Sequence, residues 1–237
     1  MKINVKLLKK EFVANNTMAF YLEKPANFEF IAGQFCEFNL INPTQADEEG
    51  NNRAFSLVSA PYEENLLIAT RMRNTAFKNT LKSLTIGDEI KLEGPYGDYK
   101  LHKTNTKPAV FIIGGIGITP VRSIIAQATR DHLPHKITLF YSNKTPLDAA
   151  FTTDFEIFAK NNPNFTFIPI YTDYTEKKWE GEHQRINSDI LKKYVTDIYS
   201  PIYYLSGPAE MVKSMREMLV SININEDNIK TEEFSGY

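Results

Sequence analysis

The sequence predicts two domains of different class: an N-terminal antiparallel six-stranded β-barrel and a C-terminal α/β domain with a five-stranded parallel sheet. Up to about residue 105, short alternating apolar runs are separated by turn residues, which is typical of a small barrel. After Lys107, apolar runs alternate with helix-like segments, which indicates a parallel sheet covered by helices on both faces. The segment Leu101–Lys107 is polar, so we expect the domains to span residues 1–103 and 104–237.

The first domain is expected to hold one helix among its strands. Phe77, Leu81 and Leu84 recur at helical spacing, which predicts a helix over Ala76–Leu84. The strand segments are rich in Phe, Val, Ile and Leu, and glycine or proline turns separate them. The expected strands are Met1–Leu8, Thr17–Glu23, Phe35–Ile41, Ala54–Ser59, Asn65–Arg73 and Glu89–Glu93.

The second domain is expected to repeat a strand and a helix four times and to end on a fifth strand. This alternation is the pattern of a doubly wound parallel sheet. The expected strands are Ala109–Ile113, Ile137–Tyr141, Phe165–Tyr171, Ile202–Leu205 and Asn228–Glu232. The expected helices are Thr119–Arg130, Thr152–Asn161, Asn187–Tyr194 and Ala209–Ile222.

Composition excludes several classes of protein. The chain has 237 residues, 42% hydrophobic and 24% charged, which is ordinary for a globular protein. A net charge of -2 argues against a general nucleic-acid binder, which normally carries a basic excess. The single cysteine, Cys36, excludes a disulfide framework and a thiolate-held iron–sulfur cluster. We find no signal peptide and no run near the ~20 apolar residues of a membrane span. We therefore expect a cytoplasmic monomer without a bound metal.

A glycine turn marks a candidate phosphate site. The apolar strand before it runs directly into Gly114-Gly115-Ile116-Gly117, and Pro120 lies where a helix would begin. Glycine lets the backbone approach a ligand closely, and proline is well tolerated in a first helical turn. The helix N-terminus then offers free N–H groups to an anion. We interpret Gly114, Gly115, Gly117, Thr119 and Pro120 as contacts to a dinucleotide pyrophosphate; a turn without a ligand is the alternative.

Other residues at the carboxyl ends of the predicted parallel strands indicate which nucleotide binds. The turn departs from G-x-G-x-x-G because Pro120 replaces the third glycine, and no acidic residue follows the second strand. Ser142, Asn143 and Lys144 stand there instead, and they favour a 2′-phosphate, hence NADPH over NADH, slightly. A solvated Lys144 is the equal alternative. Gly207-Pro208 follows the fourth strand, so we expect it at the nicotinamide end.

A second motif lies about sixty residues earlier, in Arg53-Ala54-Phe55-Ser56. Strand alternation places Arg53 and Phe55 on one face and Ala54 and Ser56 on the other. Arginine suits a phosphate because its fork is fixed and always charged. Phe55 would pack against a flat ring, and Ser56 would donate to a ring nitrogen that exchanges hydride. The alternative is an ordinary barrel strand with an exposed arginine and a core phenylalanine.

A third feature follows at the entry to the predicted helix. The segment Thr75–Thr80 would present a second helix N-terminus to an anion, with Lys78 beside it. Together with Arg53, it would hold the pyrophosphate of FAD.

In order and over essentially the whole chain, these motifs resemble those of the ferredoxin–NADP reductase superfamily of flavoproteins. Its flavin motif R-x-[YF]-S-x-x-S is matched by Arg53–Ser59. The resemblance implies FAD and NAD(P)H as cofactors, with flavin phosphate at Arg53 and flavin N5 at Ser56. The other matching segments are Phe30–Phe35, Gly94–Gly97, Gly114–Pro120, Ser206–Pro208 and Glu233–Tyr237. The rest of the implied flavin cradle comprises Ala54, Phe55, Thr70, Met72, Phe77, Lys78, Asn79 and Thr80.

Two departures from the family pattern are visible. Phe55 stands where tyrosine is commoner, and Ser206 stands where plant-type members have cysteine. The resemblance implies catalytic roles for Ser56, for Glu233 beside the nicotinamide and for Tyr237 stacked on the flavin. A solvated carboxylate and a frayed terminus are the alternatives for Glu233 and Tyr237.

The resemblance implies an FAD-dependent oxidoreductase that takes hydride from NAD(P)H onto flavin N5. Because no iron–sulfur domain is present, electrons would pass to a separate acceptor such as ferredoxin or flavodoxin. Two alternatives stay open. One is a free-flavin or ferric reductase that uses flavin as a substrate, and the other is a flavin-binding electron-transfer subunit of a larger complex. FMN in place of FAD also stays open.

Overall fold

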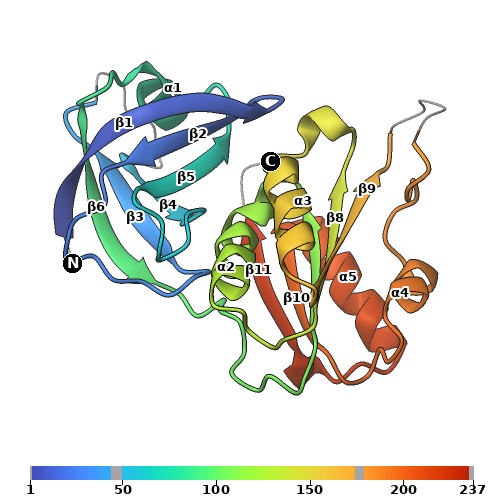
Figure 1. The fold of residues 1–237 in the computed structure, drawn as a ribbon. Helices are drawn as coiled ribbons and strands as arrows, with labels where there is room; N and C mark the ends of the chain where they lie inside the picture. The colour runs from blue at the N-terminus through green and yellow to red at the C-terminus, as the bar shows by residue number, and fades with distance from the viewer. Residues whose placement is uncertain (1, 44–49, 174–178, 235–237) are drawn as a thin grey trace.

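The computed structural model describes residues 2–43, 50–173 and 179–234 and contains both predicted sheets (Figure 1). The six strands of the first sheet are antiparallel, in the order β4-β3-β6-β1-β2-β5. This confirms the predicted barrel class. Its elements are β1 (Lys2–Ala14), β2 (Thr17–Leu22), β3 (Phe35–Leu40), β4 (Asn52–Ser56), β5 (Leu66–Arg71), α1 (Ala76–Ser83) and β6 (Glu89–Tyr96).

Strand β1 is longer than predicted. Its first half pairs with β6 and its second half with β2, so one strand serves two neighbours. Register shifts between Leu7 and Lys9 and between Phe12 and Ala14 interrupt the alternation. Because a bulge moves successive side chains to the other face, the period-two signal ends near Leu8 although the strand continues. The β1–β2 hairpin therefore projects beyond the barrel (Figure 1).

The second sheet is parallel, in the order β11-β10-β7-β8-β9, as predicted. Central strand β7 is buried on both faces. Ala109, Phe111 and Ile113 pack in the cluster that holds α2 and α3, whereas Val110 and Ile112 pack in the cluster that holds α4 and α5. The elements are β7 (Ala109–Gly114), α2 (Ile118–Arg130), β8 (Ile137–Asn143), α3 (Thr152–Asn161), β9 (Phe165–Tyr171), α4 (Ser188–Tyr194), β10 (Ile202–Pro208), α5 (Ala209–Ser221) and β11 (Ile229–Phe234).

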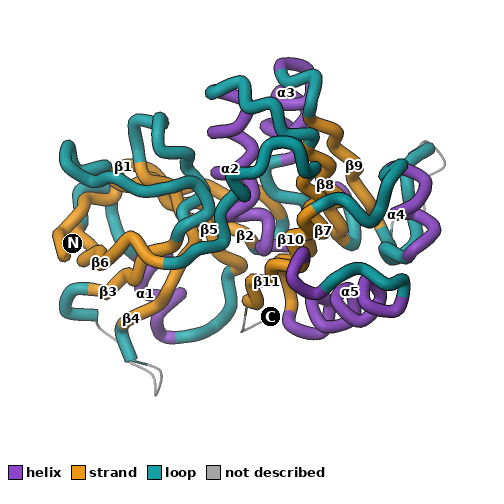
Figure 2. Tube along the Cα trace, turned by 90° about the horizontal axis from the view of Figure 1, so that it is seen from below, coloured by secondary structure: helices purple, strands orange, loops and turns teal. Residues whose placement is uncertain are grey.

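The two halves meet along β2 and β5 of the barrel and the turn that follows β7. Ala19, Leu67 and Ala69 form an apolar cluster with Ile116 from that turn. At the hairpin tip, Asn15 N donates to the carbonyl of Leu147, 2.8 Å away. Seen from below, β11 lies next to the junction between the halves (Figure 2).

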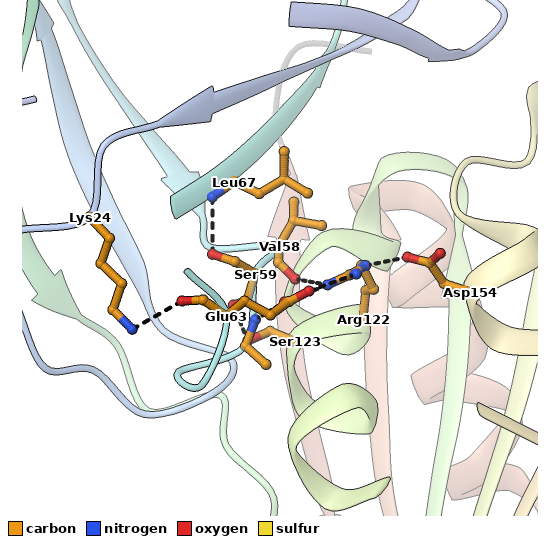
Figure 3. Close-up of polar contacts among 9 residues, drawn as sticks. Lys24, Val58, Ser59, Glu63, Leu67, Arg122, Ser123 and Asp154 are labelled. Carbon is orange, nitrogen blue, oxygen red and sulfur yellow. Dashed lines mark hydrogen bonds and ion pairs between the residues drawn. The ribbon is translucent and has the colours of Figure 1, made fainter. Parts of the chain in front are cut away.

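Polar contacts close one end of this junction (Figure 3). Arg122 on α2 donates to Glu63, in the loop after β4, and to Asp154 on α3, at 2.8 and 2.6 Å. It also donates to the carbonyl of Val58, 3.1 Å away, and Ser123 Oγ donates to the carbonyl of Ser59 at 2.7 Å. Arg122 is only 9% exposed, so these bonds replace its lost hydration. The relative placement of the two sheets rests on this network and on the apolar cluster.

Candidate cofactor-binding site

A serine of the barrel and a glutamate of the parallel sheet meet where the two halves join. Ser56 ends β4, is 4% exposed, and donates from Oγ to Glu232 Oε1, 3.2 Å away. Burial raises the pKa of the Glu232 carboxyl to about 7, and the hydrogen bond from Ser56 opposes that shift. Its second oxygen, Oε2, is buried without a partner among the described residues. The same is true of Ser206 Oγ, on the residue of β10 that pairs with Glu232.

The structure brings Glu232, the neighbour of the predicted Glu233, next to Ser56. Successive side chains of a strand point to opposite faces, so only one of two adjacent glutamates of β11 faces the barrel. That residue is Glu232; Glu233 is exposed. The structure thus places Glu232, and not the predicted Glu233, beside Ser56, and a catalytic role for Glu233 stays a prediction. Tyr237 lies outside the described residues. The last aromatic residue that the structure describes, Phe234, packs against the apolar cluster between the domains.

Arg53 and Phe55, from the flavin motif, both pack against Phe77 at one end of the barrel. The Arg53 guanidinium lies over the ring of Phe77, 5.1 Å from its centroid, and donates to the carbonyls of Gly50 and Asn52. Phe55 packs against Phe77, with centroids 5.9 Å apart. As alternation predicts, Arg53 and Phe55 lie on one face of the strand while Ser56 points elsewhere. Phe77, 2% exposed, acts here as a support beneath Arg53.

The start of α1 supplies a second positive feature. Thr75 caps the helix by accepting from the N–H of Lys78, and Lys78 Nζ donates to the carbonyl of Arg71 at 2.7 Å. An ammonium group therefore lies beside a helix N-terminus, a combination that suits a phosphate. Asn79 does not point into this arrangement, because its side chain donates to Asn74 Oδ1 at 2.8 Å.

The remaining residues of the expected cradle are part of the barrel framework. Thr70 is buried and pairs with Met18 of β2. Met72 packs against the barrel core, and its N–H donates to the carbonyl of Asn16. Thr80 lies within α1, where its carbonyl accepts from the N–H of the C-cap residue. Ala54 is exposed on the face opposite Arg53.

A cleft of about 350 Å³ lies at the carboxyl ends of the parallel strands. Residues predicted from three separate motifs line it together: Gly114, Gly115, Ser142, Asn143, Lys144 and Pro208. Asn143 is 7% exposed, yet neither polar atom of its side chain has a hydrogen-bond partner among the described residues. Buried polar groups of folded proteins are almost always hydrogen-bonded, so an unpaired amide in a cleft fits a polar ligand. The cleft therefore suits a nucleotide.

Two of the glycines are required by close backbone contact. A Cβ on Gly117 would lie 2.5 Å from the carbonyl carbon and oxygen of Ser206. Gly207 has φ +150°, and a Cβ on it would lie 3.0 Å from the Gly114 oxygen. Glycine at both positions lets the turn after β7 pack directly on the end of β10.

The first turn of α2 lies behind the cleft, and its predicted contacts to the pyrophosphate stay a prediction. Thr119 and Pro120 are buried and do not line the cleft. Thr119 Oγ1 donates to the carbonyl of Ile116 at 3.0 Å. Their contribution is to fix the turn that presents Gly114 and Gly115.

Six further described residues line the cleft, and three of them come from the barrel: Asn15, Asn16 and Arg71. A ligand in the cleft would therefore touch both halves. Arg71 Nε is buried without a hydrogen-bond partner among the described residues and adds positive charge. No local pattern marks these residues, because the hairpin reaches the cleft only through tertiary packing.

Family models match both halves of the chain. An oxidoreductase FAD-binding domain matches residues 4–101, and an oxidoreductase NAD-binding domain matches residues 111–217. Among curated proteins, the chain is 30% identical over 216 residues to a subunit of the Na⁺-translocating NADH-quinone reductase of Klebsiella pneumoniae. The alignment covers 84% of this chain and 53% of that protein, and the corresponding subunit from Neisseria gonorrhoeae matches equally. The chain thus spans about half the length of these relatives.

Solved structures share the fold. A ferredoxin NADP⁺ reductase from Neisseria gonorrhoeae with bound FAD and NADP has a TM-score of 0.80 and 22% identity, with 98% of each chain covered. The Amycolatopsis cytochrome P450 reductase GcoB has a TM-score of 0.83 at 22% identity, over 99% of this chain and 70% of that one. Within the described part of the chain, no helix has the length and apolar character that crossing a membrane requires.

Proposed function

This chain belongs to the ferredoxin–NADP reductase superfamily of FAD- and NAD-binding oxidoreductases, and we propose that it acts as the flavin-bearing electron-transfer subunit of a larger assembly. The curated relatives support the assembly, since each is named as one subunit of a Na⁺-translocating NADH-quinone reductase. These relatives favour an electron-transfer subunit of a complex over an enzyme that passes electrons to a lone ferredoxin or flavodoxin. The chain covers only about half the length of those relatives. The identity of the electron acceptor is therefore proposed here and is not taken from them.

FAD supplies the hydride acceptor, which can then release electrons to a partner. We assign its phosphates to Arg53, Lys78 and the N-terminus of α1, where two cations and a helix N-terminus lie at one end of the barrel. We assign NAD(P)H to the cleft lined by Gly114 and Asn143, where an unpaired buried amide is present.

The observation that carries the proposal is the Ser56–Glu232 hydrogen bond, because it joins the FAD-binding and NAD-binding halves at one buried point. Glu232 accepts from Ser56 and so orients the hydroxyl at the junction. With its pKa raised to about 7, the Glu232 carboxyl gains or loses a proton near neutral pH. We infer that the pair holds a proton at the point where the flavin ring and the nicotinamide ring would meet.

Anaerobic stopped-flow reduction tests this function. The purified chain should retain FAD, and NADH or NADPH should bleach it in a single fast phase. The reduced protein should then be reoxidised by a soluble quinone faster than by ferredoxin. A colourless protein that reduces added free flavin would support the free-flavin reductase instead. Rapid turnover with ferredoxin would instead support a reductase that passes electrons to a small carrier protein.

A further inference from the structure

A second and larger cavity, of about 1120 Å³, lies between the domains. It borders the Arg122 network and shares no lining residue with the nucleotide cleft. We call this second cavity the interdomain groove. It is separate from the site assigned to the cofactors.

Aromatic side chains from both domains form the walls of the interdomain groove. The barrel contributes Phe12, 59% exposed, and Tyr62, 46% exposed. The α/β domain contributes Phe151 and Trp179, and Trp179 packs on Tyr171 with centroids 4.7 Å apart. Single exposed apolar side chains are common on protein surfaces, whereas several aromatic side chains clustered around one groove indicate a binding surface.

The described residues that line the interdomain groove include more carboxylates than cations. Among the residues that the structure describes, the lining includes one guanidinium, that of Arg122, and five carboxylates: Glu11, Glu63, Glu64, Asp154 and Glu156. Two further cations lie over lining rings, Arg130 over Tyr62 and Lys82 over Phe12. Glu63 and Asp154 neutralise Arg122 (Figure 3), and Glu11 pairs with Lys9. Glu64 and Glu156 are exposed, one on each domain. A nucleotide or another anionic ligand would be repelled here.

We propose that the interdomain groove docks a basic segment of a partner protein, one in which lysine or arginine alternates with apolar side chains. Cations of the segment would pair with the exposed carboxylates Glu64 and Glu156. The apolar side chains would cover Phe12 and Tyr62. A groove of about 1120 Å³ has room for a short peptide segment. This proposal does not depend on the assigned redox function.

The chain contains one tryptophan, and it lies in this groove, so intrinsic fluorescence reports occupancy. The probe is a short synthetic peptide in which lysine and arginine alternate with leucine, carrying a fluorescent label, titrated with the FAD-loaded chain. Tryptophan fluorescence and peptide anisotropy are followed together. We expect a saturable change in both that weakens at high salt. Peptides with glutamate in place of the cations, or serine in place of leucine, should bind at least tenfold more weakly, by about 1.4 kcal/mol.

The matched variants reverse two exposed charges each. Glu64→Lys with Glu156→Lys should weaken peptide binding about tenfold, because two ion pairs become repulsions. Glu210→Lys with Glu217→Lys, on exposed positions of α5, should leave the affinity unchanged. The proposal is overturned by absent saturation, by equal affinity of both double variants, or by equal binding of the acidic peptide. Circular dichroism of each variant verifies that it is folded.

Discussion

The Nη1 and Nη2 atoms of Arg122, on α2, donate to the two carboxylate oxygens of Glu63 at 2.8 and 3.0 Å, while its Nε donates to Asp154 at 2.6 Å. One buried guanidinium thus joins the barrel to the helix layer of the parallel sheet. Two neighbouring carboxylates raise the pKa of Arg122 despite its burial, so it stays charged.

Replacement of Arg122 by methionine should therefore lower the free energy of unfolding. Loss of one partner of a buried pair costs about 3–5 kcal/mol, and the partly exposed carboxylates reduce that to about 2–3 kcal/mol. Urea unfolding measures the change. As a control, Arg216→Met removes an ion pair whose side chains are more than half exposed, and should cost less than about 1 kcal/mol. Equal costs for the two variants would contradict a linking role for Arg122.

Glu232→Gln should flatten the pH dependence of stability. Burial raises the pKa of Glu232 from 4.5 to about 7, so the folded state binds more protons than the unfolded state between these values. Stability contributed by this group is present at pH 5 and is lost as pH rises toward 8. We expect the fall between pH 5 and 8 to shrink by about 2 kcal/mol in urea unfolding. The adjacent exposed variant Glu233→Gln should keep the full slope; the same flattening there would refute the assignment.

Asn143→Ala should weaken NAD(P)H binding without a matching loss of stability. Its side-chain polar atoms have no hydrogen-bond partner of ordinary geometry among the described residues, although the side chain interacts with Tyr141. The substitution should therefore remove hydrogen bonds mainly from the ligand complex. Two such bonds correspond to a roughly tenfold rise in Kd, measured by calorimetric titration. The contrasting variant is Asn162→Ala, which loses bonds to Thr129 and Asn164. It should lower stability by about 1–2 kcal/mol and leave Kd unchanged. An unchanged Kd in Asn143→Ala would remove this residue from the nucleotide site.

Gly117→Ala should impair both packing and nucleotide binding. The added Cβ would lie 2.5 Å from the Ser206 carbonyl, and backbone atoms there cannot move aside cheaply. We expect a cost of about 1–3 kcal/mol in unfolding and a weaker affinity for NAD(P)H. Gly87→Ala is the control, since its Cβ meets nothing within 4 Å and only the backbone strain at φ +97° remains. If Gly117→Ala binds nucleotide as Gly87→Ala does, the turn does not shape the site.

Element identity was predictable because it depends on local periodicity. The helix over Thr152–Asn161 and the strand over Phe165–Tyr171 match their predicted bounds. Strand β1 was too short in the prediction because a bulge breaks the alternation after Leu7. Side-chain roles were harder to predict. Phe77 lies under Arg53, and Thr119 bonds the carbonyl of Ile116 within the first turn of α2; no local pattern predicts these contacts.

The sequence by itself determined the two fold classes, the glycine turn and the strand motif around Ser56, since each is written in neighbouring residues. Tertiary structure decided which carboxylate meets Ser56, because the register of β11 against β10 alone turns Glu232 inward and Glu233 outward. It also decided that Arg71, from the barrel, enters the nucleotide cleft. Such pairings join residues far apart in the chain, and long-range packing, which no local pattern encodes, brings them together.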